Sequence, residues 1–457
     1  MNNEEKEHQM DYMKLYNIMP VFAQNMMCSL EGFRVKKRKY GRLQKKYLPE
    51  YIERGNWTFE ELATYRDLKL REMIEHCYIH VPYYHKLFDE IGIDYHSIRG
   101  LDDLKILPIM NKQIVKENLS LLLADNVSKR DVMKMHTSGT TGSALQFYYS
   151  KTAYAQQWAE YERYAIQCGH DSPQWAAYFG GRSIVPRTGV QKAPFYRVNY
   201  PMKEVLFSAW HISPDNLPGY IEGMEKYRPL WWHGYASSIE AFAQYIIDSG
   251  KRLSFNPNGI FLSSENVTDS IKKKIYTAFG VIPVEGYAQT EEVATFREYP
   301  DDGMYIVEDL SAVELLPDDS GMFRVVGTTL TNYAMPFLRY DTNDLVDYMI
   351  TEKGRKITRI EGRAEDNIKV KDGGIIRRLD YLFKDQINVA DACIIQRSMD
   401  IVEFNIVKGA RYTEEDESRL KHDIEDFFDG RIGYKITYVD RIPKGKNGKR
   451  KFIVSEV

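Results

Sequence analysis

The spacing of apolar residues predicts helices over the first 125 positions. Thr58 to Glu61 has the form of a capping box, in which a hydroxyl and a glutamate satisfy the first amides of a helix. Apolar side chains then recur near helical spacing. Pro82 and Pro108 end helices, because proline disfavours helix at the residue before it. The periodic apolar positions are Leu68, Leu70, Met73 and Ile74.

From residue 133 onward, short apolar runs alternate with helical stretches. Met133 to Ser150 predicts a hairpin. The following alternation predicts a parallel α/β sheet, in which ligands bind outside the carboxyl ends of the strands. The predicted strands are Ala176–Phe179, Leu230–Ala236, Gly259–Leu262 and Val281–Val284, and the predicted helices are Ala153–Cys168, Ser238–Ile247 and Lys272–Phe279.

From residue 304 to 360 the pattern changes to short strands separated by turns, which predicts a β-rich subdomain. Gly362 and Arg363 then precede a smaller α/β segment. The predicted strands are Met304–Val307, Val313–Leu316, Phe323–Thr328, Phe337–Tyr340, Leu345–Ile350 and Lys356–Ile360. The fold class is therefore α/β, with a helical extension over 1–60, a large lobe with a β-rich subdomain over 61–363, and a small mobile C-terminal α/β lobe over 364–457.

Composition narrows the class of protein. The 457 residues exceed one small core, and 43% hydrophobic with 28% charged residues is typical of soluble globular proteins. The net charge of −3 gives no general attraction to nucleic acid. We expect a cytoplasmic protein, since there is no signal peptide, no run of 18 apolar residues and no CxxC pair among the four cysteines.

One stretch departs from this balance. Arg34 to Lys46 holds eight basic residues and no acid. Such a run suits a phosphate-rich surface or weak contact with an anionic membrane. A solvated face is the more ordinary interpretation, because no aromatic residues alternate with the charges for base stacking.

A loop of hydroxyls and glycines suggests phosphate binding. Glycine allows positive φ and close approach of a ligand, and successive backbone N–H groups can form an anion site. An ordinary turn explains the same residues equally well. The loop consists of Thr137, Ser138, Gly139, Thr140, Thr141 and Gly142.

Four later stretches complete an ordered set with this loop. Each alone fits a cap, a turn or a solvated charge run. They are Ser263-Ser264-Glu265, Tyr287-Ala288-Gln289-Thr290-Glu291, Arg339–Asp344 with Gly362-Arg363, and Asn447-Gly448-Lys449. In this order they resemble the adenylate-forming superfamily of acyl-CoA synthetases and adenylation domains. Val81–Tyr84, Leu107-Pro108, Arg182 and Gln24–Leu30 resemble its phenylacetate–CoA ligase branch, and within it the capsule-biosynthesis CapK type.

The resemblance implies a nucleotide site for ATP. Thr137–Gly142 would hold the β- and γ-phosphates, and Ser263, Ser264 and Glu265 would lie along the adenine. Tyr287, followed by Ala288 and Gln289, would stack on the adenine ring, and Asp344 would bind the ribose hydroxyls.

The resemblance also implies the catalytic groups. Thr290 would contact the α-phosphate, and Glu291 would bind Mg²⁺, a hard cation that prefers oxygen ligands. Arg363 would assist at the ribose or phosphate. Lys449 would offset the charge that develops when a carboxylate attacks the α-phosphorus.

Three positions depart from the family pattern. Ser143 and Ala144 follow the loop where many members have lysine or proline, so one phosphate-side cation is missing. The hinge is Glu365 or Asp366. The stretch 292–306 contains no cysteine or histidine, so we expect no structural zinc there.

The sequence therefore favours a ligase that activates a carboxylate as acyl-AMP and passes the acyl group to CoA or to an amine, the latter in polysaccharide or capsule biosynthesis. The acid pocket is expected around Trp231–Ser238 and Gly286. Two other classes of protein stay open. The first is another nucleotide hydrolase, which the lack of a G-x-x-x-x-G-K-[ST] loop disfavours. The second is a non-catalytic protein that binds anionic surfaces through residues 34–46. The oligomeric state is not indicated.

Overall fold

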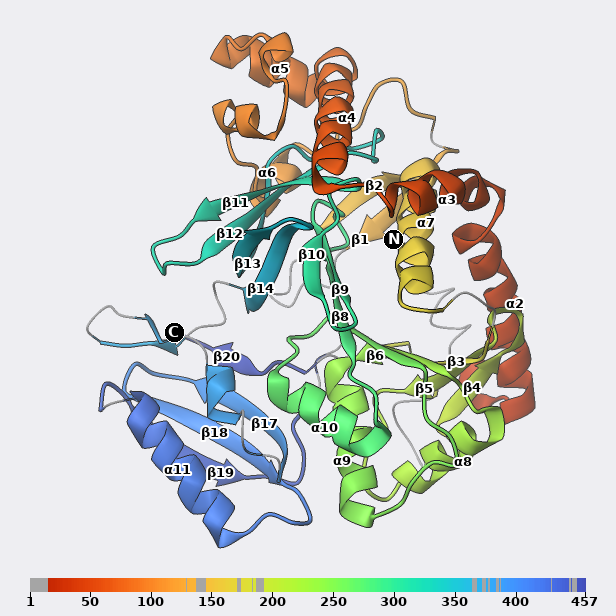
Figure 1. The fold of residues 1–457 in the computed structure, drawn as a ribbon, viewed down its shortest axis with the longest axis vertical. Helices are drawn as coiled ribbons and strands as arrows, with labels where there is room; N and C mark the ends of the chain where they lie inside the picture. The colour runs from red at the N-terminus through yellow and green to blue at the C-terminus, as the bar shows by residue number, and fades with distance from the viewer. Residues whose placement is uncertain are drawn as a thin grey trace. The chain divides into compact units, whose positions relative to one another are not determined.

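The computed structural model describes most of the chain and divides it into two compact units (Figure 1). Unit 1 contains residues 1–36, 172–284 and 365–457, and unit 2 contains residues 37–171 and 285–364. The described residues are 15–128, 130–136, 145–170, 174–182, 184–185, 193–363, 368–371, 375–376, 379–383, 386, 388–428, 430–443, 445 and 450–457.

Unit 1 contains the predicted parallel sheet. Strands β5, β3, β6 and β7 run parallel, and β4 pairs antiparallel with the outer edge of β5. Apolar side chains of α8, α9 and α10 form one core with these strands around the fully buried Trp232. The elements are β3 (Ala176–Gly180), β4 (Tyr196–Asn199), β5 (Glu204–Ser208), α8 (Leu217–Tyr227), β6 (Trp231–Tyr235), α9 (Ala236–Ser249), β7 (Gly259–Ser263) and α10 (Asp269–Phe279).

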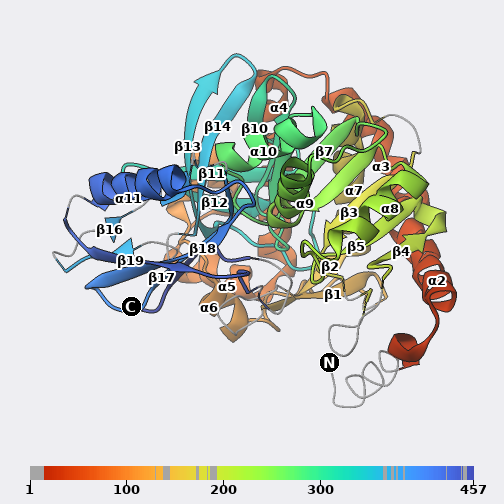
Figure 2. The ribbon, with the colours of Figure 1, turned by 90° about the horizontal axis from the view of Figure 1, so that it is seen from below.

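The C-terminal part of unit 1 is a separate small sheet with the strand order β19-β18-β17-β20. Helix α11 packs on this sheet through Leu420, Ile424 and Phe428, as Figure 1 shows. The elements are β15 (Ile368–Lys369), β16 (Ile375–Ile376), β17 (Val389–Gln396), β18 (Ile401–Lys408), α11 (Glu414–Phe428), β19 (Gly433–Tyr438) and β20 (Ile453–Ser455). Helix α2 (Val21–Lys39) begins in unit 1 and lies beside β4, as both ribbon views show (Figure 2).

Unit 2 begins with helices whose ends follow the sequence signals. The capping box forms as predicted, since Thr58 Oγ1 accepts from the Glu61 amide and Glu61 accepts from the Thr58 amide. Pro82 occupies the first turn of the next helix, where its missing N–H costs nothing. The elements are α3 (Arg42–Arg54), α4 (Phe59–His80), α5 (Pro82–Ile91), α6 (Lys112–Glu117), α7 (Lys151–Gln167) and the antiparallel pair β1 (Val132–His136) with β2 (Gln146–Ser150).

The second part of unit 2 is an antiparallel sheet with the order β11-β12-β13-β14-β10-β9-β8. The β13–β14 hairpin contains two register shifts, at which the pairing passes over Thr358 and Glu361. The strands are β8 (Val284–Ala288), β9 (Thr295–Tyr299), β10 (Gly303–Ile306), β11 (Ser311–Pro317), β12 (Phe323–Thr329), β13 (Tyr340–Thr351) and β14 (Gly354–Arg363).

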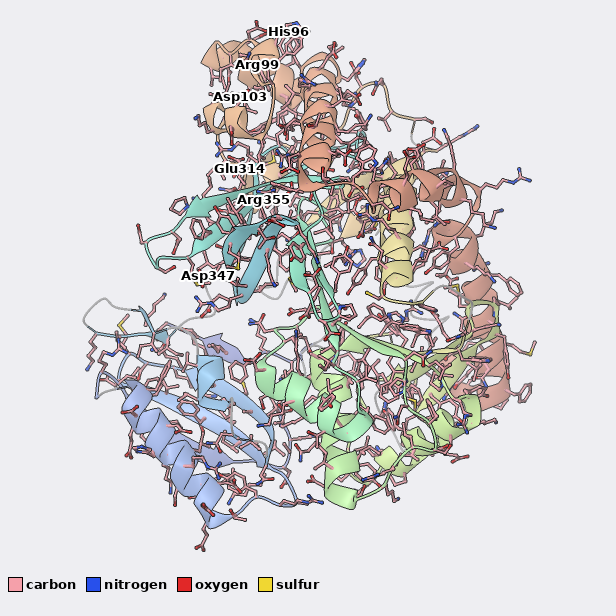
Figure 3. The ribbon with its side chains drawn as sticks, in the orientation of Figure 1. His96, Arg99, Asp103, Glu314, Asp347 and Arg355 are labelled. Carbon is pink, nitrogen blue, oxygen red and sulfur yellow. The ribbon has the colours of Figure 1, made fainter. Side chains whose placement is uncertain are left out.

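A group of buried ion pairs joins the helices of unit 2 to this sheet; we call it the 308–309 cluster. Asp309 accepts from Arg54 and Arg163, each over 2.8 Å. Glu308 accepts from Arg66 over 2.8 Å and from Arg355 over 2.7 Å. Arg355, labelled in Figure 3, also donates to the Val313 carbonyl. The two adjacent carboxylates are thus each held between two guanidinium groups, as buried charges require.

Two predicted strands are placed differently in the structure. Val281–Pro283 is not a strand, because β8 begins only at Val284 and continues to Ala288. Phe337–Leu338 is also irregular, and β13 begins at Tyr340 after Arg339, which has φ 51°. Phe337 and Leu338 are buried in the core, so their apolar character reflects burial and not strand pairing.

The α/β class is confirmed by the two sheets of unit 1 and the β-rich sheet of unit 2. The compact units cross the expected boundaries at residues 60 and 363, and the three-domain division stays a prediction. Among the described residues, no helix combines the length and the apolar character needed to cross a bilayer.

Candidate nucleotide-binding site

Tyr287 lies on β8 and is held by Asp344, Gln289 and Phe296. Its hydroxyl donates to Asp344 Oδ2 over 2.6 Å, and Gln289 Nε2 donates to the hydroxyl oxygen. Its ring stacks on Phe296, with 4.5 Å between the centroids. Burial and the Asp344 carboxylate raise the pKa of Tyr287 well above its usual value. The hydroxyl therefore stays protonated and remains a donor.

Asp344 lies opposite Arg363 in the β13–β14 hairpin. Residues directly opposite each other in an antiparallel pair have Cβ atoms about 5 Å apart on the same face. Two residues that are 19 positions apart in the sequence therefore become neighbours. The hairpin brings together the predicted ribose-binding carboxylate and the predicted catalytic arginine.

The residues of β13 that precede Asp344 are held by their own side chains. Asp341 accepts from the Asn343 amide over 2.9 Å, and Thr342 Oγ1 accepts from the Asp344 amide over 3.2 Å. Asn343 has φ 62°, a left-handed conformation that is uncommon for a residue other than glycine. Left-handed non-glycine residues recur at Ser264, inside a predicted motif, and at Glu292, directly after another. Such strain is typical of ligand sites.

Thr290 and Glu291 follow β8. Thr290 is exposed, and Glu291 is half-buried and accepts from the Tyr340 hydroxyl over 3.2 Å. Among the described residues there is no group of three or more histidine, cysteine, aspartate or glutamate side chains placed to hold a metal. Mg²⁺ is commonly held by one or two carboxylates together with substrate phosphates, and one accessible glutamate fits that pattern.

Glu292 was not singled out from the sequence. It is 1% exposed, and neither carboxyl oxygen has a hydrogen-bond partner in the described part of the chain. Burial raises the pKa of Glu292 well above its usual value, which favours the neutral form of this carboxyl. Two adjacent glutamates thus have opposite environments. A sequence signal existed in the doubled glutamate, but the sequence does not tell which of the two is buried.

The Ser263-Ser264-Glu265 segment lies at the carboxyl end of β7, as predicted. The Glu265 carboxylate accepts from the Ser237 amide over 2.8 Å and from Ser237 Oγ over 3.0 Å. Ser237 lies in the first turn of α9, where a negative charge is favoured by the helix dipole. Glu265 also accepts from the Arg450 amide over 2.7 Å. This side chain therefore joins β7, α9 and the C-terminal segment.

The Arg450 side chain is largely buried in a second ionic group, which we call the Arg450 cluster. Its guanidinium binds Asp391 on β17 and lies 3.3 Å from Glu240 on α9. Lys274 on α10 lies 3.1 Å from Glu240 and donates to the Val389 carbonyl. Together with Glu265, the cluster links the small C-terminal sheet to α9 and α10. Its central residue, Arg450, directly follows Lys449 in the sequence.

Several predicted residues lie outside the described part of the chain. The loop Thr137–Gly142, Lys449 and the hinge candidates Glu365 and Asp366 belong to this group. Arg363 is described in its backbone position on β14, without its side chain. Their roles stay predictions.

The region expected to form the acid pocket lies partly in the core. Trp231 and Trp232 are buried, and Trp232 Nε1 donates to the Pro229 carbonyl. His233 stacks on Phe261, with 4.9 Å between the centroids and 7° between the ring planes. The two tryptophans therefore stabilise the sheet of unit 1, and the acid pocket around Trp231–Ser238 and Gly286 stays a prediction.

Comparison with known proteins gives matches along nearly the whole chain. Residues 368–456 match the family model of the CapK C-terminal domain. Protein CapK of Staphylococcus aureus is 24% identical over 453 residues, which cover 97% of this chain and 99% of that protein. Phenylacetate-coenzyme A ligase of Thermus thermophilus is 24% identical over 345 residues, which cover 68% of this chain and 72% of that protein.

Solved structures share the fold. A crystal structure of 2-hydroxyisobutyryl-CoA ligase in the postadenylation state gives a TM-score of 0.66 at 14% identity, and covers 86% of this chain and 89% of that chain. A structure of the same ligase with 2-HIB-AMP and CoA, in the thioesterification state, gives a TM-score of 0.54 at 16% identity and covers 87% of this chain and 90% of that chain.

These matches agree with the ordered motifs and with the neighbouring positions of Tyr287, Asp344 and Arg363 on the sheet of unit 2. The similarities to CapK and to phenylacetate-coenzyme A ligase support a place in the adenylate-forming superfamily of ligases, in its phenylacetate–CoA ligase branch and near the CapK type.

Proposed function

We propose that the protein is an ATP-dependent, AMP-forming ligase. In the first step an oxygen of a carboxylate substrate attacks the α-phosphorus of ATP. The new oxygen–phosphorus bond gives an acyl adenylate, and pyrophosphate leaves. In the second step an acceptor attacks the acyl carbon, its proton is lost, and AMP leaves.

The observation that carries this proposal is the grouping of Tyr287, Asp344 and Arg363. A hydrogen bond and the β13–β14 register bring together three residue types expected for adenine, ribose and phosphate. Phe296 covers one face of the Tyr287 ring, so an adenine would stack on the other face. Asp344 accepts from Tyr287 through Oδ2 and would accept a ribose hydroxyl through Oδ1.

Glu291 would hold Mg²⁺, which supplies positive charge at the phosphates. Tyr340 orients this carboxylate by donating to Oε1 over 3.2 Å. Thr290 would donate its exposed hydroxyl to the α-phosphate, and Arg363 and Lys449 would offset the negative charge that develops during the attack. The Thr137–Gly142 loop would bind the leaving pyrophosphate through its N–H groups and hydroxyls.

The test is carboxylate-dependent exchange of labelled pyrophosphate into ATP, with Asp344→Asn as the diagnostic variant. This change keeps the shape of the side chain and removes its charge, and a hydrogen bond to a charged group contributes about 1.5–3 kcal/mol. We expect the KM for ATP to rise about tenfold or more, because each 1.4 kcal/mol corresponds to a factor of about ten.

Asp347→Asn is the matched control. Asp347 lies on the same strand, and its carboxylate forms an accessible ion pair with Arg359 over 3.0 Å. Its KM for ATP should equal that of the wild type. No exchange with any member of a broad carboxylate panel, or an equal effect of both changes, would contradict the proposed site. ADP as the product would indicate a nucleotide hydrolase.

The acceptor is proposed as the thiol of CoA or an amine. The phenylacetate–CoA ligase branch supports CoA, and likeness to CapK supports an amine acceptor in polysaccharide or capsule biosynthesis. Mass spectrometry of reactions supplied with CoA, amino sugars or amino acids distinguishes a thioester from an amide. A thioester formed only with CoA would exclude the amine.

A further inference from the structure

Helix α2 presents large apolar side chains to solvent. Phe22 is 69% exposed, Met26 62%, Leu30 63% and Phe33 64%. Their spacing of four, four and three residues places them on one face of the helix. Isolated exposed apolar residues are ordinary, but an ordered stripe of this kind marks an interaction surface.

The opposite face of α2 is already occupied by its own unit. Asn25 accepts from the Val198 amide over 3.0 Å, and Gln24 accepts from Arg197 over 2.6 Å. Gly32 is buried, and a Cβ there would lie 1.9 Å from the Asn199 side chain, so the helix needs glycine to approach β4. The helix is therefore fixed on β4 with its apolar stripe turned away from that strand.

Basic residues follow the stripe on the same helix. Arg34 lies four residues after Leu30 and Lys37 four residues after Phe33, so each is the next neighbour along the exposed face. Both are exposed. Glu31 is the one acid in the sequence from Val21 to Lys46. The local positive charge contrasts with the overall charge of −3.

The size of the stripe argues against a second copy of the chain as its partner. From Phe22 to Phe33 it is about 17 Å long at 1.5 Å per residue, and one helix is about 10 Å wide. Its footprint of about 170 Å² is far below the roughly 800 Å² that each partner contributes to a stable interface. Binding to a bilayer surface does not require a complementary protein surface of that size.

We propose that the exposed face of α2 docks on the surface of a bilayer containing anionic phospholipid. The helix lies in the plane of the interface, with the apolar stripe at the boundary of the acyl chains. Arg34 and Lys37 lie at the level of the headgroups, where they bind phosphate. The attachment is peripheral and reversible, and it is independent of the proposed ligase activity.

The test is flotation of the full chain with vesicles of phosphatidylcholine alone or of phosphatidylcholine mixed with phosphatidylglycerol. We expect binding to the mixed vesicles, reduced by sodium chloride because salt screens exposed charges. Phe22→Ser/Phe33→Ser and Arg34→Glu/Lys37→Glu should each reduce the bound fraction about tenfold, since anchoring needs both apolar burial and charge.

Two matched controls carry equivalent changes on other surfaces. Met349→Ser/Ile350→Ser removes apolar side chains that are 52% and 73% exposed, and Arg71→Glu/Lys86→Glu reverses two exposed charges on α4 and α5. Both controls should float like the wild type. Circular dichroism and pyrophosphate exchange verify that each variant is folded.

Three results would overturn the proposal. The first is no flotation with mixed vesicles. The second is flotation that is unchanged by Phe22→Ser/Phe33→Ser. The third is a dimer of the wild type that Phe22→Ser/Phe33→Ser converts into a monomer, which would show that a second copy covers the stripe.

Discussion

The 308–309 cluster and the Arg450 cluster use the same chemistry in different positions. Both hold carboxylates against cationic side chains, and the carboxylates are buried in the first cluster and partly exposed, except for Glu240, in the second. In the 308–309 cluster, four arginines surround two carboxylates, and the arginines come from α3, α4, α7 and β14. In the Arg450 cluster, Arg450 and Lys274 meet three carboxylates, which are Glu265 directly after β7, Glu240 on α9 and Asp391 on β17.

The two clusters have similar contacts but differ in their relation to the predicted nucleotide motifs. None of the six side chains of the 308–309 cluster belongs to a predicted nucleotide motif. The Arg450 cluster includes Glu265, from the predicted adenine segment, and Arg450, which follows Lys449 in the sequence. Because Arg450 is the next residue in the sequence, a change there is expected to affect the predicted role of Lys449. The first cluster is expected to act on stability, and the second on one step of the reaction.

The largest effect is expected from Asp309→Ala, which leaves Arg54 and Arg163 buried without their carboxylate. Breaking a buried ion pair on one side costs about 3–5 kcal/mol. We expect the free energy of unfolding in urea to fall by that amount. The activity of the remaining folded protein should stay close to that of the wild type.

Asp347→Ala is the control for this change, because its ion pair with Arg359 is accessible to water. Surface ion pairs contribute about 0–1 kcal/mol, so this variant should unfold near the wild-type urea concentration. A larger loss for Asp347→Ala than for Asp309→Ala would mean that the buried cluster is not the main ionic contribution to unit 2.

The second effect is expected from Arg450→Gln and concerns one half-reaction. Loss of the guanidinium frees the chain beside Lys449, and a misplacement of about 1 Å can lower a rate about 100-fold. We expect carboxylate-dependent pyrophosphate exchange to fall to that extent. Transfer of the acyl group from a synthetic acyl adenylate should change less than about threefold, since the predicted role of Lys449 lies in adenylation.

Arg450→Lys retains one charge and should restore part of the exchange. Arg397→Gln, which removes an exposed arginine near Glu403, should leave both half-reactions unchanged. An equal loss of adenylation and transfer in Arg450→Gln would show that the cluster serves only to stabilise the fold. Pyrophosphate exchange at the wild-type rate in Arg450→Gln would show that Arg450 does not position Lys449.

The smallest effect concerns Glu292, a buried carboxyl that no cation binds within hydrogen-bonding distance among the described residues. Its unfolded pKa is near 4.5, and its folded pKa is raised by burial. The folded state therefore binds this proton more tightly than the unfolded state. The contribution to stability is full below the unfolded pKa and is lost as the pH rises through the folded pKa.

Glu292→Gln should remove this dependence. At pH 4 the variant and the wild type should unfold at similar urea concentrations. At pH 8 the variant should be the more stable by about 1.4 kcal/mol for each pKa unit of the shift. The wild type should therefore lose stability relative to the variant between pH 4 and pH 8. If it does not, Glu292 is ionised and paired in the folded protein.

The sequence predicted the parallel strands of unit 1 and the capping box at Thr58, because apolar periodicity and capping are local signals. It placed Ser263–Glu265 at the end of a strand, which the structure confirms. It failed at Val281–Pro283 and Phe337–Leu338, where apolar residues are followed by the start of a strand. Boundaries depend on pairing partners that a local pattern does not contain.

The arrangement of the site was harder to predict than its members. The sequence named Tyr287, Asp344 and Arg363, but the hydrogen bond between the first two and the register that joins the last two are long-range facts. The role of Arg450 was hidden because it stands in a run of cations, for which a solvated surface is the ordinary expectation. Its partners Glu240 and Asp391 lie far away in the sequence and carry no motif.

The β13–β14 hairpin has a consequence for how the chain tolerates changes in its length. The strand register passes over Thr358 and Glu361, so β14 uses two more residues than β13 between the turn and the pair Asp344–Arg363. Deletion of one of them would remove its bulge and leave residue 363 opposite Asp344, because the pairs on either side keep their partners. A single deletion of Thr358 should therefore be tolerated, and the shortened chain should fold and keep its affinity for ATP.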